Sequence, residues 1–202
     1  LNPPLPVVAL VLGDPAGIGP ELIARLLAEP SRMQGANVVL VGDPWLWAQG
    51  QQTASLQVAT QSVGSLADVR TRTNTSQPAF LALDTMRPEH VQVGQAQALG
   101  GASVLLVLNH CMDAAKAGDV DAICFAPLNK QAMKMGGLKH DDELHHFAQY
   151  LGVQGFFCEF NTLNGLWTSR ISSHVPMADV PKYLTRARVI EATTLIYRSL
   201  QA

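Results

Sequence analysis

Polar residues that could do chemistry stand in three places, each directly after a run of apolar residues. Asp14 lies in the glycine-rich stretch Gly13-Asp-Pro-Ala-Gly-Ile-Gly-Pro-Glu21, Asn129 and Lys130 follow the run 122–126, and His174 follows the run 166–172. Open α/β sheets bind their ligands outside the carboxyl ends of their strands. These residues are therefore candidates for a binding or catalytic site.

Each candidate has a functional and a structural interpretation. Lys130 can hold a phosphate or carboxylate as a point charge, or lower the pKa of an alcohol. The alternative is an exposed lysine at a helix start, and we favour the functional role because the stretch Pro127-Leu-Asn-Lys130 directly follows a strand expected to be buried. His174 is either a neutral imidazole metal ligand or a histidine held by backbone hydrogen bonds at a turn, and the sequence favours neither.

A denser group of titratable residues stands at the start of a capped helix expected within 140–152, with Asp141 or Asp142 as its N-cap. Glu143 and His146 share one face of that helix, His145 is adjacent, and His140 is nearby. A carboxylate and an imidazole on one face can bind a metal or exchange protons. A charged, solvated first turn has the same composition, so the sequence alone leaves both interpretations open.

The glycine-rich stretch is typical of a turn from a buried strand into a helix. Its glycines allow backbone angles closed to other residues, Pro20 suits a first helical turn, and Glu21 complements the helix dipole. Free N–H groups there could hold an anionic or polar group. The spacing is not that of a dinucleotide fingerprint, since Leu22 stands where the third glycine belongs and no Walker lysine follows. A purely structural connection is slightly favoured by spacing alone.

The elements that must position these residues alternate between short strands and helices. The sequence predicts strands over 7–12, 37–42, 56–60, 79–83 and 122–126, and helices over 20–29, 45–52 and 95–117. This alternation predicts an α/β fold with a largely parallel sheet flanked by helices. The run 122–126 is apolar throughout, as a central parallel strand requires.

The remainder of the chain is expected to contribute part of a second α/β domain. After the helix over 142–152, strands are predicted at 156–160 and 166–172, and Asn164-Gly165 between them is a strong hairpin signal. One or more helices are expected over 180–200.

Composition narrows the classes of function. The 202 residues carry a formal net charge of -2 and no basic run, which argues against a nucleic-acid partner. The longest apolar stretches are too short to cross a membrane and the first residues lack a secretion signal, so a cytoplasmic protein is expected. The three cysteines, Cys111, Cys124 and Cys158, are expected to be buried reduced thiols.

Several segments in order resemble the 4-hydroxythreonine-4-phosphate dehydrogenase family of vitamin B6 (pyridoxine) biosynthesis and its four-carbon sugar-acid phosphate relatives. The resemblance covers residues 7 to 200. The stretch 13–21 matches the family's opening signature, and it is joined in order by Val39-Leu-Val-Gly-Asp-Pro44, Gly118-Asp-Val-Asp-Ala122, Ala126-Pro-Leu-Asn-Lys130 and Ser172-Ser-His-Val-Pro176. The resemblance implies a fold like that of isocitrate and isopropylmalate dehydrogenases. Residues 1–202 would then be the N-terminal portion of a two-domain enzyme, without the C-terminal metal and NAD region.

What the family implies is a metal-dependent, NAD- or NADP-linked oxidation of a secondary alcohol in a small, phosphorylated hydroxy acid, in some members followed by decarboxylation. A divalent cation such as zinc, magnesium or cobalt favours the alkoxide, and hydride leaves toward nicotinamide. His174 matches the first of three metal histidines, in a set completed across a homodimer interface. Asn129 and Lys130 match a substrate loop, and the Asp14 turn resembles an active-site wall; we expect Lys130 and Asp14 to be catalytic.

Two departures from the family pattern bear on function. Where the family has Gly-His-Thr-Glu, with substrate contacts, this chain has Asp142, Glu143, Leu144 and His145. We expect the last three to contact substrate, and Glu143 to repel a phosphate, so a hydroxy acid without phosphate, or one held through a second cation, is easier to accommodate. A small shift of the alignment would instead bring a histidine into the site. The chain also stops before the segments that hold the other two metal histidines, so this polypeptide alone should be inactive, because one histidine makes no tight metal site.

Two other functions remain open from the sequence. Phosphate acyltransferases have a similar architecture and need no hydride acceptor. A non-catalytic binding or regulatory module would explain the missing histidines and the replaced Gly-His-Thr-Glu.

Overall fold

The computed structural model describes residues 4–73, 75–140, 142–173 and 175–201. The chain divides into two compact units, Leu1–Asp142 and Glu143–Ala202.

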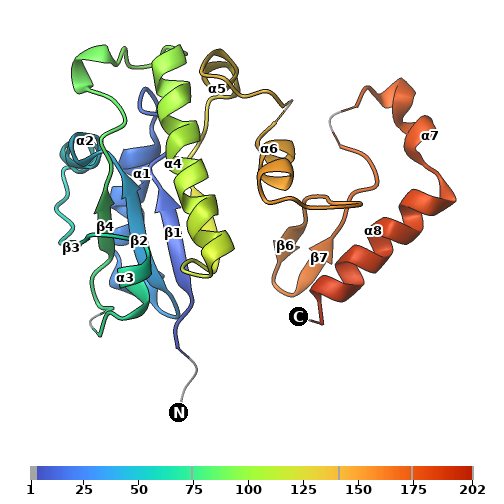
Figure 1. Cartoon of the computed structure of the whole chain (residues 1–202), viewed down its shortest axis with the longest axis horizontal. Coiled ribbons are helices and arrows are strands. Elements are labelled where there is room, and N and C mark those ends of the chain that lie inside the picture. Colours follow the sequence, from blue (N-terminus) through green and yellow to red (C-terminus); the bar gives the residue numbers. More distant parts are fainter. Residues whose placement is uncertain (1–3, 74, 141, 174, 202) are drawn as a thin grey trace. The chain divides into compact units, whose positions relative to one another are not determined.

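The first unit is built on a five-stranded parallel sheet with the strand order β3-β4-β2-β1-β5 (Figure 1). Its strands are β1 (Val7–Val11), β2 (Asn37–Gly42), β3 (Gln61–Val63), β4 (Ala79–Ala82) and β5 (Ala122–Phe125). Its helices are α1 (Gly19–Leu27), α2 (Pro44–Ala54), α3 (Ala67–Arg70), α4 (Ala98–Ala117) and α5 (Lys130–Met135), with 3₁₀ turns at Pro30–Met33 and Pro88–His90. The predicted α/β class and the predominantly parallel sheet are confirmed.

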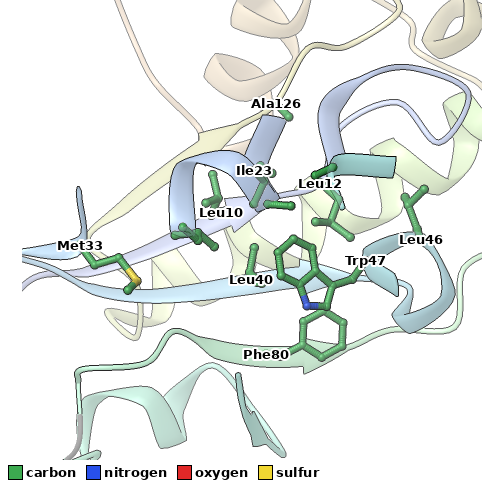
Figure 2. Close-up of a cluster of buried hydrophobic side chains, with 12 residues drawn as sticks. Leu10, Leu12, Ile23, Met33, Leu40, Leu46, Trp47, Phe80 and Ala126 are labelled. Atoms are coloured by element: carbon green, nitrogen blue, oxygen red, sulfur yellow. The ribbon is translucent and has the colours of Figure 1, made fainter. Parts of the chain in front are cut away.

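Alternation along the strands explains why both faces of this sheet are covered. Leu10, Leu40 and Phe80 pack with Ile23 of α1 and Trp47 of α2 in one buried cluster, shown in Figure 2. The odd-numbered neighbours on β1 and β2 point to the opposite face, where α4 crosses the sheet (Figure 1). The core is therefore two apolar layers, one on each side of β1 and β2.

Helix α4 is the long helix that the sequence predicts, and Gly118 ends it with a left-handed backbone at φ 83°. By length and composition alone its 20 residues could cross a membrane, contrary to the expectation that no stretch was long enough. More than half of its most apolar window is buried within the protein, and the helix contacts β1, β5 and α5. These contacts are those of a core helix.

Strand β5 differs from its prediction as a central strand buried on both faces. It lies at the edge of the described sheet, and its residues alternate between exposed and half-buried. The apolar residues of 122–126 indicate a hydrophobic strand, but they do not indicate whether other strands flank it on both sides. The prediction of a central position was therefore wrong. Cys124 on β5 is accordingly exposed and Cys158 is half-buried, so only Cys111 fits the expectation of a buried thiol.

The strand predicted over 56–60 is also displaced, because these residues form a connection without regular secondary structure and β3 begins at Gln61. A hydrogen bond from the Val58 amide to Gln51 Oε1 draws this connection toward α2, and the Gln61 amide donates to Pro78 O. Pairing with β4 therefore begins only at residue 61.

The second unit contains α6 (Glu143–Tyr150), the hairpin strands β6 (Asn161–Leu163) and β7 (Leu166–Thr168), α7 (Val180–Tyr183) and α8 (Arg186–Ser199), with a 3₁₀ turn at Met177–Asp179. The hairpin is antiparallel, and its turn residues Asn164 and Gly165 have φ values of 46° and 85°. A two-residue turn with two positive φ angles pairs the residues beside it. Leu163 therefore pairs with Leu166, and the ladder ends at the pair of Asn161 with Thr168. Both predicted strands are too long, because 156–160 forms no strand and the strand predicted over 166–172 ends at Thr168.

Candidate functional site

The carboxyl end of β1 carries the glycine-rich turn, and close packing rather than ligand binding explains two of its glycines. A Cβ on Gly13, whose φ is 85°, would lie 2.8 Å from Pro127 O, and one on Gly19 would lie 2.3 Å from Leu12 O. These residues let the chain ends of β1 and β5 and the start of α1 approach one another. Gly17 and Ile18, by contrast, are exposed at the tip of the turn.

Asp14 is buried inside this turn, with 7% of its surface exposed. Its Oδ1 accepts a hydrogen bond from the Ala16 amide at 3.0 Å, which closes the turn on itself. A Cβ on Gly100 of α4 would lie 3.7 Å from the same oxygen, so the carboxylate faces the N-terminal end of α4. This geometry makes Asp14 a residue that holds the turn, and its assignment as a catalytic group stays a prediction.

The loop after β5 carries Asn129 and Lys130 to the same edge of the sheet as the Asp14 turn. The Asp14 amide donates to Pro127 O at 3.1 Å, so the two loops are joined through their backbones. Asn129 is the N-cap of α5, and its Oδ1 accepts from the Ala132 amide at 3.0 Å. Lys130 is the first residue of α5 and is exposed to solvent. The structure therefore brings Asp14, Asn129 and Lys130 together.

The N-terminal half of α4 packs against the Asp14 turn and against α5, the helix that follows the loop after β5. A Cβ on Gly101 would lie only 1.8 Å from Ala132 O of α5, and one on Gly136 would lie 2.2 Å from the Ala102 amide nitrogen. The two helix backbones therefore pack directly against each other. The position of α5, and with it that of Lys130, depends on this contact.

A second buried carboxylate at this edge was not singled out by the sequence reasoning. Asp43 follows β2, is 2% exposed and accepts hydrogen bonds from Thr85, whose hydroxyl also contacts Ser103 of α4. The signal that could have found it is the recurrence of Gly-Asp-Pro after two neighbouring strands, at 13–15 and 42–44.

The remaining predicted site residues belong to the second unit. Glu143, Leu144 and His145 occupy the first turn of α6; Glu143 and Leu144 are half-buried, and the exposed His145 packs edge-on against Phe157 with ring centroids 5.4 Å apart. His174 lies outside the described residues, so its predicted role as a metal ligand stays a prediction. Among the described residues, no three His, Cys, Asp or Glu side chains gather closely enough to hold a metal ion.

The segment that leads to His174 is tied together by a polar cluster. Arg170 forms an ion pair with Glu159 and also donates to Asn161 Oδ1 at 3.4 Å and Ser173 Oγ at 3.4 Å. This cluster links the two chain segments on either side of the hairpin, so the residue directly before His174 is held by its neighbours.

A surface groove of about 460 Å³ lies elsewhere on the first unit, between α2 and the segment 88–93. The indole of Trp45 lines it, and the Trp45 Nε1–H is fixed by a hydrogen bond to Met86 O at 2.8 Å. No predicted site residue lines this groove.

Comparison with known proteins accounts for the order of these segments. Residues 34–202 match the family described as pyridoxal phosphate biosynthetic protein PdxA. A Pseudomonas aeruginosa protein provisionally named 4-hydroxythreonine-4-phosphate dehydrogenase 2 is 42% identical over 98% of this chain, and a Pasteurella multocida protein provisionally named 4-hydroxythreonine-4-phosphate dehydrogenase is 40% identical over 96%. The chain spans 58% and 57% of the lengths of these relatives.

Solved structures agree on the fold. The crystal structure of 4-hydroxythreonine-4-phosphate dehydrogenase from Klebsiella pneumoniae superposes with a TM-score of 0.85, covering 100% of this chain and 60% of that one, at 24% sequence identity. This likeness supports the fold, and the sequence matches support kinship. On these grounds the chain belongs to the PdxA family of pyridoxal phosphate biosynthetic proteins.

Proposed function

We propose that this chain is the N-terminal portion of a metal-dependent, NAD- or NADP-linked dehydrogenase that oxidises the secondary alcohol of a small hydroxy acid. The observation that carries the proposal is the backbone junction between the Asp14 turn and the Asn129–Lys130 loop at the carboxyl edge of the sheet. Ligands of open α/β sheets bind at this edge. The names of the relatives that the chain resembles supply the reaction class.

Lys130 is the residue that we assign to the reacting end of the substrate. Its ammonium group stands at an exposed helix start, where it can hold an anionic group or stabilise the developing alkoxide as a point charge. Asn129 fixes the start of that helix with its Oδ1, and its side-chain amide carries N–H groups that can donate to a ligand. Asp14 keeps the neighbouring turn closed, so that the wall beside Lys130 has one shape.

The described residues do not by themselves assemble a divalent-metal site. We propose His174 as one ligand and expect the others from outside this chain, because a single imidazole binds such a metal weakly. When bound, the metal acts as a Lewis acid on the substrate's oxygen atoms, and the nicotinamide accepts hydride. We also propose that the protein is a homodimer, as the family resemblance implies, and that it is located in the cytoplasm.

Substrate choice is assigned to Glu143, Leu144 and His145, which stand where the family has His-Thr-Glu. The carboxylate of Glu143 would repel a phosphate, and the side chain of Leu144 has no hydrogen-bond donor for it. We therefore propose that this protein prefers a hydroxy acid without a phosphate at that position. Replacing Glu143→His together with Leu144→Thr should improve turnover of a phosphorylated substrate, and an unchanged or lower turnover would contradict the assignment.

The test of the function uses a polypeptide extended to the length of the relatives. Purified protein is mixed with NAD or NADP, a divalent metal and hydroxy acids with and without a phosphate, and absorbance of the reduced nicotinamide is followed. We expect reduction that a chelator abolishes and that His174→Ala removes, and no turnover by the 202-residue chain. Acyl transfer from an acyl phosphate without nicotinamide would instead support the acyltransferase, and binding without any turnover would support a regulatory module.

A further inference from the structure

Two neighbouring strands end in the same sequence, and the proposed function uses the carboxylate of only one of them. Gly13-Asp14-Pro15 comes just after β1, and Gly42-Asp43-Pro44 begins at the last residue of β2. Both aspartates are almost completely buried, with 7% and 2% of their surfaces exposed. Burying a carboxylate is unfavourable in free energy unless the group is well hydrogen-bonded. The hydrogen bonds of Asp43 therefore show what this residue holds in place.

The partners of Asp43 form a short directional chain. Its Oδ1 accepts from the Thr85 amide at 2.8 Å, and its Oδ2 accepts from the Thr85 hydroxyl at 2.5 Å. Thr85 Oγ1 also lies 2.5 Å from Ser103 Oγ. A hydroxyl has one proton to donate; because Thr85 gives its proton to Asp43, Ser103 must donate to Thr85. The chain therefore runs from Ser103 through Thr85 to Asp43.

The hydrogen bonds from Asp43 through Thr85 to Ser103 reach α4, the helix that packs against α5. Ser103 and Gly100 lie three residues apart on one face of α4, and Gly100 is the residue that faces Asp14 Oδ1. The Asp14 carboxylate thus faces the N-terminal half of α4 directly, and the Asp43 carboxylate is linked to it through Thr85 and Ser103. At Gly101 the same part of α4 touches the α5 backbone, with no room for a side chain. The contacts from Asp43 to α5 are continuous.

We propose that Asp43, acting through Thr85 and Ser103, is a positioning residue that fixes the N-terminal half of α4 and thereby the place of Asn129 and Lys130. The hydrogen bond from Ser103 to Thr85 ties α4 to the segment that Asp43 holds, and because it is directional it adds to the apolar packing a preference for one position of the helix. The importance of Lys130 in this proposal rests on the proposed function. The control of α5 by Asp43 does not, because it follows from the contacts alone.

The first test uses the 202-residue chain and needs no activity. Thr85→Val removes the hydroxyl and keeps the side-chain shape, leaving Ser103 without its acceptor, while Thr85→Ser keeps the hydroxyl. Amide hydrogen exchange of residues 130–136 is measured in both and in Val69→Ala, a cavity variant in α3 that serves as the matched control for a general loss of stability. We expect exchange about tenfold faster in Thr85→Val and near the wild-type rate in Thr85→Ser.

Two exchange results would overturn the proposal. One is faster exchange confined to 84–97 in Thr85→Val, and the other is equal acceleration of 130–136 in Val69→Ala at the same loss of stability. Either result would leave Asp43 with a local structural role only.

The second test uses the longer protein and asks whether the positioning matters to the reaction. We expect Thr85→Val to lower kcat by about tenfold with little change in KM, since a shifted Lys130 weakens the transition state more than substrate binding, and Thr85→Ser to restore kcat. An unchanged kcat in Thr85→Val would contradict this part. Absence of any dehydrogenase activity in the wild type would overturn the proposed function instead, and the exchange result would still decide the role of Asp43.

Discussion

Replacing Gly101 with alanine tests the contact on which the placement of Lys130 depends. The added Cβ would lie 1.8 Å from Ala132 O and 2.2 Å from its carbonyl carbon, where ordinary contact begins at 3.4 Å. Both groups belong to helix backbones, so no side-chain rotation relieves the overlap. Helices α4 and α5 would have to separate by about 1.6 Å.

The expected change in the unfolding free energy of Gly101→Ala is the sum of two opposing effects. Alanine in place of glycine in a helix interior is favourable by about 1 kcal/mol, whereas overpacking costs about 1–3 kcal/mol. An overlap with backbone belongs at the upper end of that range, so we expect Gly101→Ala to lose about 2 kcal/mol of unfolding free energy net. For a chain of this size that corresponds to a Tm lower by about 4–8 °C.

The neighbouring glycine provides a matched control in the same turn of α4. A Cβ on Gly100 would meet Asp14 Oδ1 at 3.7 Å, which is an ordinary contact. Gly100→Ala should therefore leave the protein as stable or make it more stable by up to about 1 kcal/mol. Urea and thermal unfolding of both variants measure the difference. A Gly101→Ala protein as stable as Gly100→Ala would refute the close packing of α4 on α5.

Three further predictions concern other parts of the chain. Burial raises the pKa of the Cys111 thiol to about 12, so a thiol reagent near neutral pH should label the exposed Cys124 in the folded protein and Cys111 only on unfolding; rapid native labelling of Cys111 would contradict this. A hydrogen bond from Arg70 lowers the pKa of the Asp121 carboxyl, so its ion pair stabilises the fold above the unfolded pKa of about 4 and loses that effect as the pH falls toward the lowered value. The Tm gap between wild type and Asp121→Asn should shrink on acidification, and a gap that widens there would be inconsistent with the ion pair. Gly165→Ala places a side chain at φ 85° and should cost the hairpin about 1 kcal/mol, measured as faster amide exchange in β6 and β7; unchanged exchange would argue against this turn.

The parts of the fold that follow from local chemistry could be predicted from the sequence. Short β-branched runs gave the positions of β1 and β2, Gly118 marked the end of α4, and Asn164-Gly165 specified the hairpin turn. Each of these depends on residues near one another in the chain. The prediction that β5 is a central, buried strand was wrong, because the place of a strand in a sheet depends on which strands flank it in space.

The candidate site could be predicted only in part. Polar residues at the ends of two predicted parallel strands indicated that Asp14 and Lys130 lie at one edge of the sheet, and the backbone contact between their loops agrees with this. The inward-facing carboxylate of Asp14 and the capping role of Asn129 were not predictable, because both depend on the path of the backbone after the strand. The buried chain through Asp43, Thr85 and Ser103 joins residues distant in sequence, so no spacing pattern indicates it. The role of His174 stays a prediction.

The proposed dehydrogenase requires that the loops after β1 and β5 hold the substrate. A crystal structure of the longer protein with its hydroxy-acid substrate bound tests this most directly. We predict the reacting hydroxyl within hydrogen-bond reach of Lys130 Nζ, beside a closed Asp14 turn. A substrate bound away from Lys130, for example in the groove beside Trp45, would contradict the assignment of these loops to the substrate site.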